Sequence, residues 1–415
     1  MPEFLQLLPP QEALARWLSA FPHRQPSSEN IESIHSLGRI IAAHITAPHP
    51  LPAFPRSTVD GYAVRAADSY GASESLPAYF TVIGEVLMGC QPEIPLGPAQ
   101  AALIHTGGML PEGADAVVMV EYTQAARENE IEVTRAVAPL ENILRVGEDV
   151  DAGQVVIPAG RRLRPAEIGG LMAFGIQTVP VLCQPRIAVL STGDEVVPPA
   201  VEPCPGQVRD INSYSLSALI EEWGAVPVRY GIIPDRAEAL KSAVAAALAD
   251  CDALVITAGS SASSRDITAQ VIQQAGAPGV LVHGVNVRPG KPTILGVCGE
   301  KPAIGLPGNP VSALVIAWLF VPAMIAALQG MAQAPQKDHV TARLSINVAS
   351  LAGREDWIPV TLHQAAGSLL AEPVFFKSNL IFNLAGADGL MLIPADANGL
   401  AAGERIQVYR LSRAP

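Results

Sequence analysis

Residues 187–195 read Ile187-Ala-Val-Leu-Ser-Thr-Gly-Asp-Glu195, a short apolar run followed at once by hydroxyl, glycine and carboxylate residues. The same order recurs where Ala253–Ile256 is followed by residues 257–266, and where Ala303–Gly305 is followed by residues 306–312. Short apolar runs of this kind predict strands that are buried on both faces of a sheet. The stretch therefore predicts the core of an α/β domain.

Helical segments separate these runs. They are predicted at Asn212–Trp223, Asp235–Leu248 and Asp266–Gln274, and each begins with a residue type that caps helices. A further strand is predicted at Pro227–Ile233. Alternation of strands and helices indicates a doubly wound, mostly parallel sheet with right-handed crossovers. We therefore expect a central α/β domain at residues 185–332.

The flanking segments predict three smaller domains, so the fold class is multi-domain α/β plus β. We expect a discontinuous helical and extended domain at residues 1–50 and 141–184, a β-rich domain at residues 51–140, and a C-terminal β barrel or sandwich at residues 336–415. The predicted helices outside the α/β domain are Pro10–Ser19, Ser28–Ala43 and Pro165–Phe174, and the predicted strands are Phe80–Val86, Ala101–His105, Ala116–Glu121, Ile131–Val137, Val340–Val348, Trp357–Leu362, Leu390–Pro394 and Ile406–Leu411.

Composition excludes several classes of function. The 415 residues include 27 Lys and Arg against 39 Asp and Glu, and a net charge of −12 argues against a general binder of nucleic acid or anionic membranes. The five cysteines form no CxxC pair and the eight histidines lack ligand spacing, so we expect neither a disulfide framework nor a zinc site. No basic residue precedes Arg16, which argues against a signal peptide and favours a cytoplasmic protein.

One apolar segment could be mistaken for a membrane span. Residues 313–328 are uncharged and strongly apolar, but they are fewer than the roughly 20 that a bilayer requires, and Pro322 interrupts them. We expect a buried helix of the α/β domain and no membrane association.

Four polar segments follow strands of the predicted sheet. They are residues 191–195, 257–266, 288–292 and 306–312, and the third of them follows a strand predicted at Val282–Val287. In an open α/β sheet, ligands bind at the carboxyl ends of the strands. These segments would place hydroxyls and backbone N–H groups for phosphate, two cations, and carboxylates for a divalent metal ion at one edge.

Each polar segment also has a structural explanation. The serine-rich loop is compatible with an ordinary turn, residues 288–291 with a solvated turn, residues 306–310 with the start of the buried helix, and Glu195 with a surface position. A fifth polar segment, residues 54–65, contains Asp60-Gly61, which is a hairpin turn signal. Only the arrangement of four segments at one edge favours a functional site.

Six motifs together make the chain resemble the molybdopterin molybdenumtransferase family, which is MoeA-type and related to the E domain of gephyrin. The resemblance covers nearly the whole chain and rests on Ser57-Thr-Val-Asp60-Gly-Tyr-Ala-Val-Arg65, Thr106-Gly with Gly113-Ala-Asp-Ala-Val-Val118, Asn142-Ile with Gly147-Glu-Asp149, Ser191-Thr-Gly-Asp-Glu195, Pro289-Gly-Lys-Pro292 and Leu306-Pro-Gly-Asn-Pro-Val-Ser312.

The resemblance implies an elongated four-domain homodimer and a reaction. The enzyme would insert molybdate into adenylylated molybdopterin and release AMP in a step that depends on Mg²⁺ or another divalent ion. Molybdate is then a co-substrate, and a transient contact with molybdopterin adenylyltransferase is implied. Because the substrate carries its own sulfurs, no cysteine cluster is required.

The resemblance also implies site residues. Asp60, Thr106, Glu195 and Asp266 would be catalytic, with the three carboxylates also binding metal and with Asp60 and Thr106 coming from the partner subunit. Substrate contacts are expected from Ser57, Ser191, Thr192, Gly193, Ser260, Ser261, Arg288, Pro307, Gly308 and Asn309, and oxyanion contacts from Lys291, Pro292, Ser312, Arg354 and Ser378.

Four positions depart from the family pattern: Pro55, Ser263 in a loop one residue short, Gly284 and Asn383. Arg288 also replaces a common lysine. These departures leave open a preference for tungstate, or a non-catalytic scaffold that binds molybdopterin. A molybdopterin adenylyltransferase is a further alternative, although that enzyme resembles only residues 185–332.

Overall fold

The computed structural model describes residues 7–22, 26–258, 262–331, 336–365, 367–375 and 377–411. The chain forms two compact units: a smaller unit of residues 30–181, and a larger unit of residues 1–29 and 182–415. The larger unit contains the predicted α/β core.

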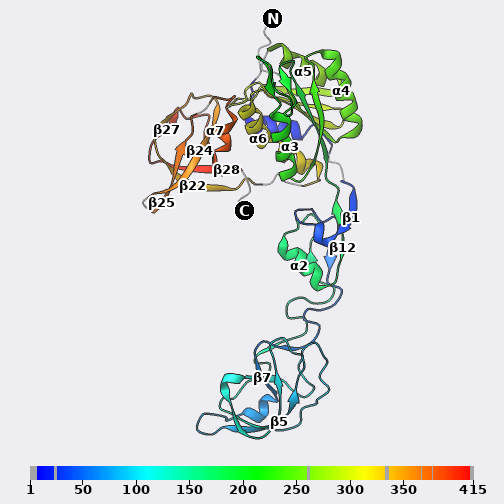
Figure 1. Cartoon of the computed structure of the whole chain (residues 1–415), viewed down its shortest axis with the longest axis vertical. Coiled ribbons are helices and arrows are strands. Elements are labelled where there is room, and N and C mark those ends of the chain that lie inside the picture. The colour runs from blue at the N-terminus through cyan, green and yellow to red at the C-terminus, as the bar shows by residue number, and fades with distance from the viewer. Residues whose placement is uncertain are drawn as a thin grey trace. The chain divides into compact units, whose positions relative to one another are not determined.

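The larger unit is built around a six-stranded mixed sheet (Figure 1). The four predicted strands lie together in it and pair in parallel, which confirms the mostly parallel prediction. Two further strands, β20 and β18, extend one edge, and β20 is antiparallel to both of its neighbours. In spatial order the strands are β16 (Val226–Ile233), β13 (Arg186–Thr192), β17 (Ala253–Thr257), β21 (Lys301–Leu306), β20 (Ile294–Cys298) and β18 (Pro278–His283).

Helices cover both faces of this sheet, as a doubly wound fold requires. Alternate residues of β13 point to opposite sides: Ile187 and Val189 pack in one core, and Ala188 and Leu190 in the other. The first core contains α1 (Pro10–Leu18), α3 (Asn212–Glu222) and α6 (Pro310–Leu328), and the second contains α4 (Ala237–Asp250) and α5 (Ala262–Gln274).

The predicted helix caps are wrong. α3 begins at Asn212 after Ile211, α4 begins after Arg236, and α5 begins at Ala262, so Asp266 lies inside its helix. At α3 the cap is supplied from further upstream, because the Asp210 carboxylate accepts a hydrogen bond from the Ser213 backbone N–H at 3.1 Å. Sequence patterns locate helices well but their first residues poorly.

α6 is the buried helix that was expected from residues 313–328. By length and composition it could cross a membrane, but 83% of its most apolar window is buried inside the protein. Pro310 occupies the first turn, where a missing N–H costs nothing, and Pro322 lies inside the helix. α6 is therefore the central core element of the larger unit.

Residues 339–410 form a closed five-stranded barrel, so the barrel alternative is confirmed over the sandwich. Its strands, in order around the barrel, are β24 (Glu355–Ala365), β25 (Ser368–Pro373), β22 (His339–Leu344), β28 (Arg405–Arg410) and β26 (Gly389–Ile393), which returns to β24. Additional elements are β23 (Val348–Ala349), β27 (Gly399–Leu400) and α7 (Ile381–Ala385). β19 (Val287–Arg288), which follows β18, pairs in parallel with β24 and joins the two domains.

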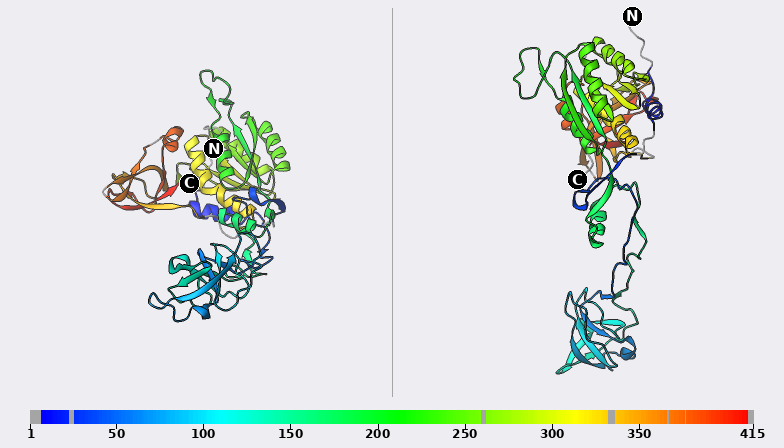
Figure 2. Two further views of the ribbon diagram at one scale, coloured as in Figure 1. Left: turned by 60° about the horizontal axis from the view of Figure 1, so that its bottom comes forward. Right: turned by 90° about the vertical axis from the view of Figure 1, so that its right-hand side faces the viewer.

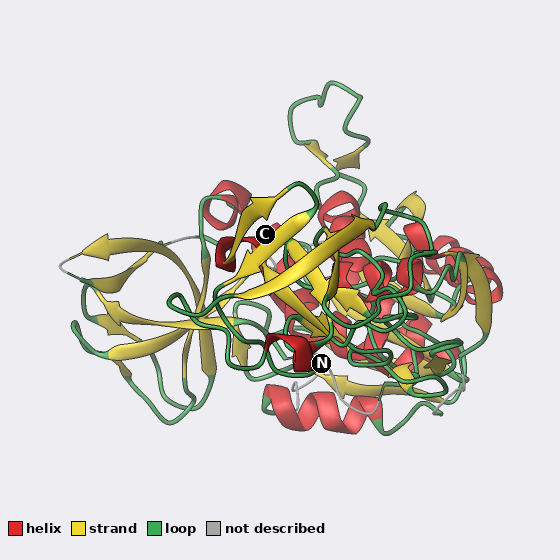
Figure 3. Cartoon of the chain, turned by 90° about the horizontal axis from the view of Figure 1, so that it is seen from below, coloured by secondary structure: helices red, strands yellow, loops and turns green. Residues whose placement is uncertain are grey.

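A narrow arm extends from the larger unit between β13 and α3. Its base is the parallel pair β14 (Val196–Val197) and β15 (Val208–Arg209). Figures 2 and 3 show the arm as a loop that projects away from the sheet. The base of this arm borders the candidate site.

The smaller unit contains a second six-stranded sheet. In spatial order its strands are β7 (Ala116–Met119), β4 (Gly61–Val64), β6 (Gln100–Ile104), β5 (Ala78–Glu85), β9 (Glu130–Val133) and β8 (Thr123–Arg127). Three two-stranded pairs, one helix and three short 3-10 turns complete it: β1 (Ser28–Glu32) with β12 (Thr178–Leu182), β2 (Ile45–Thr46) with β11 (Val155–Ile157), β3 (Arg56–Ser57) with β10 (Ile143–Leu144), α2 (Pro165–Ala173), η1 (Ser33–His35), η2 (Ala66–Ser69) and η3 (Val120–Tyr122).

The predicted helix at residues 28–43 is wrong. The segment forms β1, η1 and isolated bridges that join Ile40 to Arg162 and Ile41 to Val181. Ile41 is fully buried, and it packs with residues from 157–181. Tertiary pairing with this distant segment therefore overrides the local helical pattern. Domain boundaries finer than the two units stay a prediction.

Candidate active site

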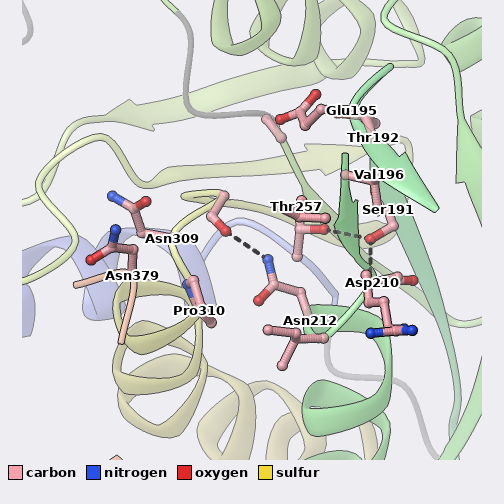
Figure 4. A pocket seen from close by; sticks show the side chains of 15 residues that line it. Ser191, Thr192, Glu195, Val196, Asp210, Asn212, Thr257, Asn309, Pro310 and Asn379 are labelled. Carbon is pink, nitrogen blue, oxygen red and sulfur yellow. Dashed lines mark hydrogen bonds between the residues drawn. The ribbon is translucent and has the colours of Figure 1, made fainter. Parts of the chain in front are cut away.

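A cavity of about 410 Å³ lies at the carboxyl edge of the parallel strands (Figure 4). The ends of β13 and β17 form its floor, and the segment that leads from β21 into α6 forms a wall. The lining residues are Ser191, Thr192, Glu195, Val196, Val208, Arg209, Asp210, Ile211, Asn212, Thr257, Ala258, Gly308, Asn309, Pro310 and Asn379. Three of the four predicted polar segments therefore contribute to this cavity, and the base of the arm encloses one side.

The floor carries a buried hydrogen-bond network. Ser191 Oγ donates to Asp210 Oδ1 at 3.0 Å and lies 3.1 Å from Thr257 Oγ1. Ser213 donates twice to the same carboxylate, from its backbone N–H and from Oγ at 2.5 Å. Asp210 was not predicted, because its partners are distant in sequence and only the fold brings them together.

The wall is fixed by two asparagines. Asn212 Nδ2 donates to the Gly308 carbonyl at 2.9 Å, and Asn309 Nδ2 donates to Ser378 Oγ at 3.0 Å. The Val311 N–H donates to the Ser378 carbonyl at 3.0 Å. The start of α6 is therefore held between α3 and the barrel, and Ser378 lies beside the cavity wall.

Glu195 stands exposed at the rim, where the chain turns from β13 into the arm. Gly193, with φ of +146°, makes this turn, and a Cβ there would lie 2.9 Å from Glu195 Oε2. A larger residue would strain the backbone and displace the carboxylate. The glycine therefore places Glu195 over the cavity.

Asp266 does not line this cavity. It is exposed and lines a separate groove of about 540 Å³ with Gln270, Gln273 and His283, along α5 and β18. Glu195 and Asp266 thus border different cavities. Ser260 and Ser261 lie outside the described residues, as does the side chain of Ser263.

A second polar cluster joins β19 to the barrel. The Asp356 carboxylate is buried, and it accepts hydrogen bonds from Arg354 Nε and Ser350 Oγ, each at 2.9 Å. Arg288 Nη1 lies 3.6 Å from the same carboxylate. One carboxylate therefore orients the guanidinium group of Arg354 and also forms an ion pair with Arg288, which comes from a different domain.

The other expected oxyanion residues are dispersed. Lys291 is exposed, Pro292 is half-buried, and Ser312 is buried in the first turn of α6. Gly284 has φ of +106°, a conformation that favours glycine. Pro307 lies between β21 and α6, and Asn383 lies on α7.

The smaller unit carries the Asp60 cluster. Thr106 donates two hydrogen bonds to Asp60 Oδ1, one from its backbone N–H at 2.8 Å and one from its Oγ1 at 3.2 Å. The backbone hydrogen bond is the main reason that the pKa of Asp60 is lowered. The histidines were expected to be structural or surface residues, and the ring of His105 lies 3.7 Å from Asp60 and 3.1 Å from Glu85. The predicted pair Asp60 and Thr106 is therefore in contact.

Two further predictions about this unit have an outcome. Ser57 is buried, and its Oγ donates to the Val59 carbonyl at 2.6 Å, so its hydroxyl stabilises the local turn. The hairpin turn expected at Asp60-Gly61 is wrong, because Gly61 begins β4 between β6 and β7. Pro55 precedes β3, and its carbonyl accepts the Leu110 N–H.

Three family models match successive parts of the chain. They are the MoeA N-terminal region (domain I and II) at residues 8–175, a probable molybdopterin binding domain at 188–326, and the MoeA C-terminal region (domain IV) at 341–411. A putative molybdopterin biosynthesis protein of Methanocaldococcus jannaschii is 35% identical over 95% of both chains. Molybdopterin molybdenumtransferases of Nostoc and Bacillus subtilis are 33% and 34% identical over 93% of this chain and 89% and 90% of theirs.

Solved structures agree with this similarity. A molybdopterin biosynthesis MoeA protein from Pyrococcus horikoshii superposes with a TM-score of 0.82 at 36% identity, covering 99% of this chain and all of that one. A second MoeA structure from this organism superposes with a TM-score of 0.83 at 31% identity, covering 97% of this chain.

Proposed function

The chain belongs to the MoeA family, and from this premise we propose that it transfers molybdenum from molybdate to adenylylated molybdopterin, releasing AMP. Family membership makes it a molybdopterin molybdenumtransferase of molybdenum cofactor biosynthesis. The adenylylated form of the substrate and the release of AMP are the finer part of the proposal.

The observation that best supports this reaction is the 410 Å³ cavity. It is lined by hydroxyls, two carboxylates and the start of α6, and it lies where parallel α/β sheets bind ligands. The amino-terminal end of a helix favours anions because its backbone N–H groups and dipole point outward. A ligand with phosphates fits this arrangement.

The donor set fits a magnesium ion. Mg²⁺ is usually held by one or two carboxylates together with waters and substrate phosphates. The described residues contain no group of three or more His, Cys, Asp or Glu that could hold a metal by themselves, but Glu195 at the rim can supply the single carboxylate that such a site needs. We propose Glu195, with Asp266 and Asp60 as further candidates. Bound Mg²⁺ would neutralise phosphate charge during release of AMP.

Arg354, Arg288, Lys291, Ser312 and Ser378 are the proposed oxyanion residues. Arg354 and Arg288 are supported by their shared carboxylate, which fixes the direction of the Arg354 guanidinium by a hydrogen bond and lies 3.6 Å from that of Arg288. Ser378 is supported by its hydrogen bond to Asn309 at the cavity wall. Pro292 keeps its predicted role without a contact that supports it. Molybdate and tungstate have similar charge and shape, so these residues do not decide between them.

We also propose that the protein acts as a homodimer in which Asp60 and Thr106 of a second copy complete the site. The Asp60 carboxylate is oriented by Thr106 and exposed on its own unit, which suits a group that reacts with a ligand bound elsewhere. The five free cysteines suit a cytoplasmic location. A transient contact with molybdopterin adenylyltransferase would supply the substrate.

The test measures AMP release from adenylylated molybdopterin in the presence of Mg²⁺, with molybdate, with tungstate or without either oxyanion. The proposal expects AMP release that depends on an oxyanion. A Glu195→Gln variant tests the proposed metal ligand. It keeps the shape of the side chain but removes its charge, and it should lose most of the turnover. Tight substrate binding without AMP release under every condition would refute the reaction and favour a molybdopterin-binding scaffold.

A further inference from the structure

The hydroxyls on the cavity floor have fixed hydrogen-bond directions. Ser191, Asp210 and Thr257 are 3%, 7% and 2% exposed, so water cannot easily reorient them. A serine or threonine hydroxyl has one proton to donate and two lone pairs to accept, whereas an ionised carboxylate only accepts. The partners of each group therefore determine which way its proton points.

The Ser191 proton points into the protein. Ser191 Oγ donates to Asp210 Oδ1 at 3.0 Å, and both hydrogen bonds from Ser213 also end on this carboxylate. Since Ser191 has no second proton, Thr257 cannot accept from it, and the contact of 3.1 Å between the two oxygens requires Thr257 as donor. Asp210 therefore sets the polarity of the network.

The Thr257 proton is also directed inward. Its acceptor is Ser191 Oγ at 3.1 Å, and the Leu190 carbonyl at 3.5 Å is a more distant second one. Both belong to the protein, so the Thr257 proton is used inside it, and the hydroxyl lone pairs that these bonds leave unused can accept from a ligand. The floor thus presents acceptors, backed by the negative charge of Asp210. A phosphate oxygen there would meet lone pairs and a carboxylate.

We propose that this floor, Ser191, Thr257 and Asp210, is a subsite for a neutral hydrogen-bond donor of the ligand, with Asp210 as the positioning residue. The donor is an N–H or amino group of a fused heterocycle, or a ribose hydroxyl. The phosphates then lie away from the floor, toward the start of α6. The inference rests on the proposed function, and it specifies the substrate contact that was expected of Ser191.

A metal ion is a poorer occupant of the floor. Lone pairs also attract cations, but two neutral hydroxyls and one carboxylate that already accepts three hydrogen bonds leave little charge for one. No cluster of three or more metal-ligating side chains occurs in the part of the chain that the structure describes. A neutral donor group needs no such cluster.

Two variants separate this subsite from a structural role. Thr257→Val removes one acceptor and keeps the shape of the side chain, so it should weaken the binding of the donor ligand only. Asp210→Asn removes the charge that repels anions and the acceptor that holds the Ser191 proton. It should therefore bind phosphate more tightly, which a merely destabilised protein would not do. Ser217→Ala is the control, because it removes a buried hydroxyl bonded to Ser213 without lining the cavity.

The experiment is calorimetric titration of the full chain and these variants with pterin, adenosine and inorganic phosphate, in the absence of divalent metal. Wild type should bind pterin or adenosine, and whichever of the two binds identifies the source of the donor. Thr257→Val should weaken that probe about tenfold and leave phosphate binding unchanged, and Asp210→Asn should tighten phosphate binding several-fold.

The inference is overturned if neither neutral probe binds wild type, if Thr257→Val weakens only the binding of phosphate, or if Asp210→Asn weakens the binding of phosphate. Its failure is separable from that of the proposed function, because AMP release from the full substrate is measured independently. Loss of AMP release with an intact pattern of probe binding would refute the reaction and keep the subsite.

Discussion

Arg354, which immediately precedes β24, donates a hydrogen bond of 2.9 Å from Nε to Oδ1 of Asp356 on that strand. Arg288 lies opposite Asp356 in the β19–β24 register, and its Nη1 is 3.6 Å from the other oxygen of the same carboxylate. Paired guanidinium groups bind tetrahedral oxyanions through several parallel N–H bonds. The buried carboxylate is therefore an orienting group for the proposed oxyanion residues.

Asp356→Asn should weaken molybdate binding about tenfold, because the amide no longer compensates or aligns the two cations. Breaking a buried ion pair also lowers stability, and with Arg354 partly exposed we expect a loss of roughly 1–3 kcal/mol. Isothermal titration and thermal melting measure the two effects, with Glu372→Gln, an exposed position on β25, as control. Lower stability with unchanged molybdate affinity would show that Asp356 only joins the domains.

Asp60→Asn should reduce turnover by roughly a hundredfold or more, the usual range for a group that acts in the reaction. The Thr106 N–H holds the pKa of Asp60 below its usual value, so the carboxylate stays ionised further into the acidic range than a free aspartate. Activity lost on mild acidification should therefore not come from Asp60. The melting temperature should be unchanged because the side chain is 63% exposed.

The matched control for Asp60 is Asp68→Asn in the same unit, whose carboxylate accepts the Ala99 N–H at 2.9 Å. It should retain full turnover. Equal activity of both variants, measured as AMP release, would remove Asp60 from the reaction. Unfolding of the Asp60 variant would instead indicate a structural role.

Lys337→Met should raise the melting temperature at pH 7. Lys337 Nζ lies 4.3 Å from the centre of the Trp318 ring, and burial lowers its pKa from 10.5 to about 8. The folded state thus disfavours the charged form, and wild-type stability should rise between pH 8 and 10.5 as the unfolded chain binds more protons. We expect a gain of about 1–2 kcal/mol for the variant at pH 7, reduced from the full linkage value by the cation–π contact.

The advantage of Lys337→Met should become small near pH 10.5, where the folded-state lysine is neutral and half of the lysine in the unfolded chain is neutral as well. Melting curves at pH 7, 9 and 10.5 test this, with exposed Lys241→Met on α4 as control. A lower melting temperature for the variant at pH 7 would mean that the contact with Trp318 outweighs the cost of burial.

Gly61→Ala should disrupt the smaller unit alone. A Cβ at Gly61 would lie 1.9 Å from the Val118 carbonyl oxygen, so the pairing of β4 with β7 would have to separate. Overpacking of this kind costs about 3 kcal/mol or more. Hydrogen exchange should show lost protection in residues 61–64 and 116–119, with the larger unit unchanged. Gly169→Ala in α2, where a Cβ meets open space, should instead stabilise by about 0.5–1 kcal/mol.

The sequence predicted the parts of the fold that local patterns determine. Four short apolar runs identified the parallel strands, and an apolar stretch with prolines identified α6, because burial on both faces leaves no polar alternation. The helix predicted at residues 28–43 was wrong, because their apolar spacing suits a helix while Ile40 and Ile41 form β-bridges to residues that are distant in sequence. β20 and β18 depend on similar pairing across one sheet edge.

The candidate site divides in the same way. Loops at strand ends were predictable, and Ser191, Glu195, Gly308 and Asn309 do line one cavity. Asp210, His105 and Asp356 were missed, because an isolated acid or histidine gains meaning only from partners that are distant in sequence or unpredictable in orientation. Asp210 meets a residue 19 positions earlier, and His105 meets Glu85, 20 positions earlier.

The most direct test of the central claim is a single-turnover measurement on the purified chain with adenylylated molybdopterin, Mg²⁺ and molybdate. Molybdenum bound to the pterin product is counted by elemental analysis, and AMP is counted by chromatography. The account predicts one molybdenum atom per AMP released, and no AMP when the oxyanion is omitted. AMP release without molybdenum in the product, or no AMP at all, would contradict it.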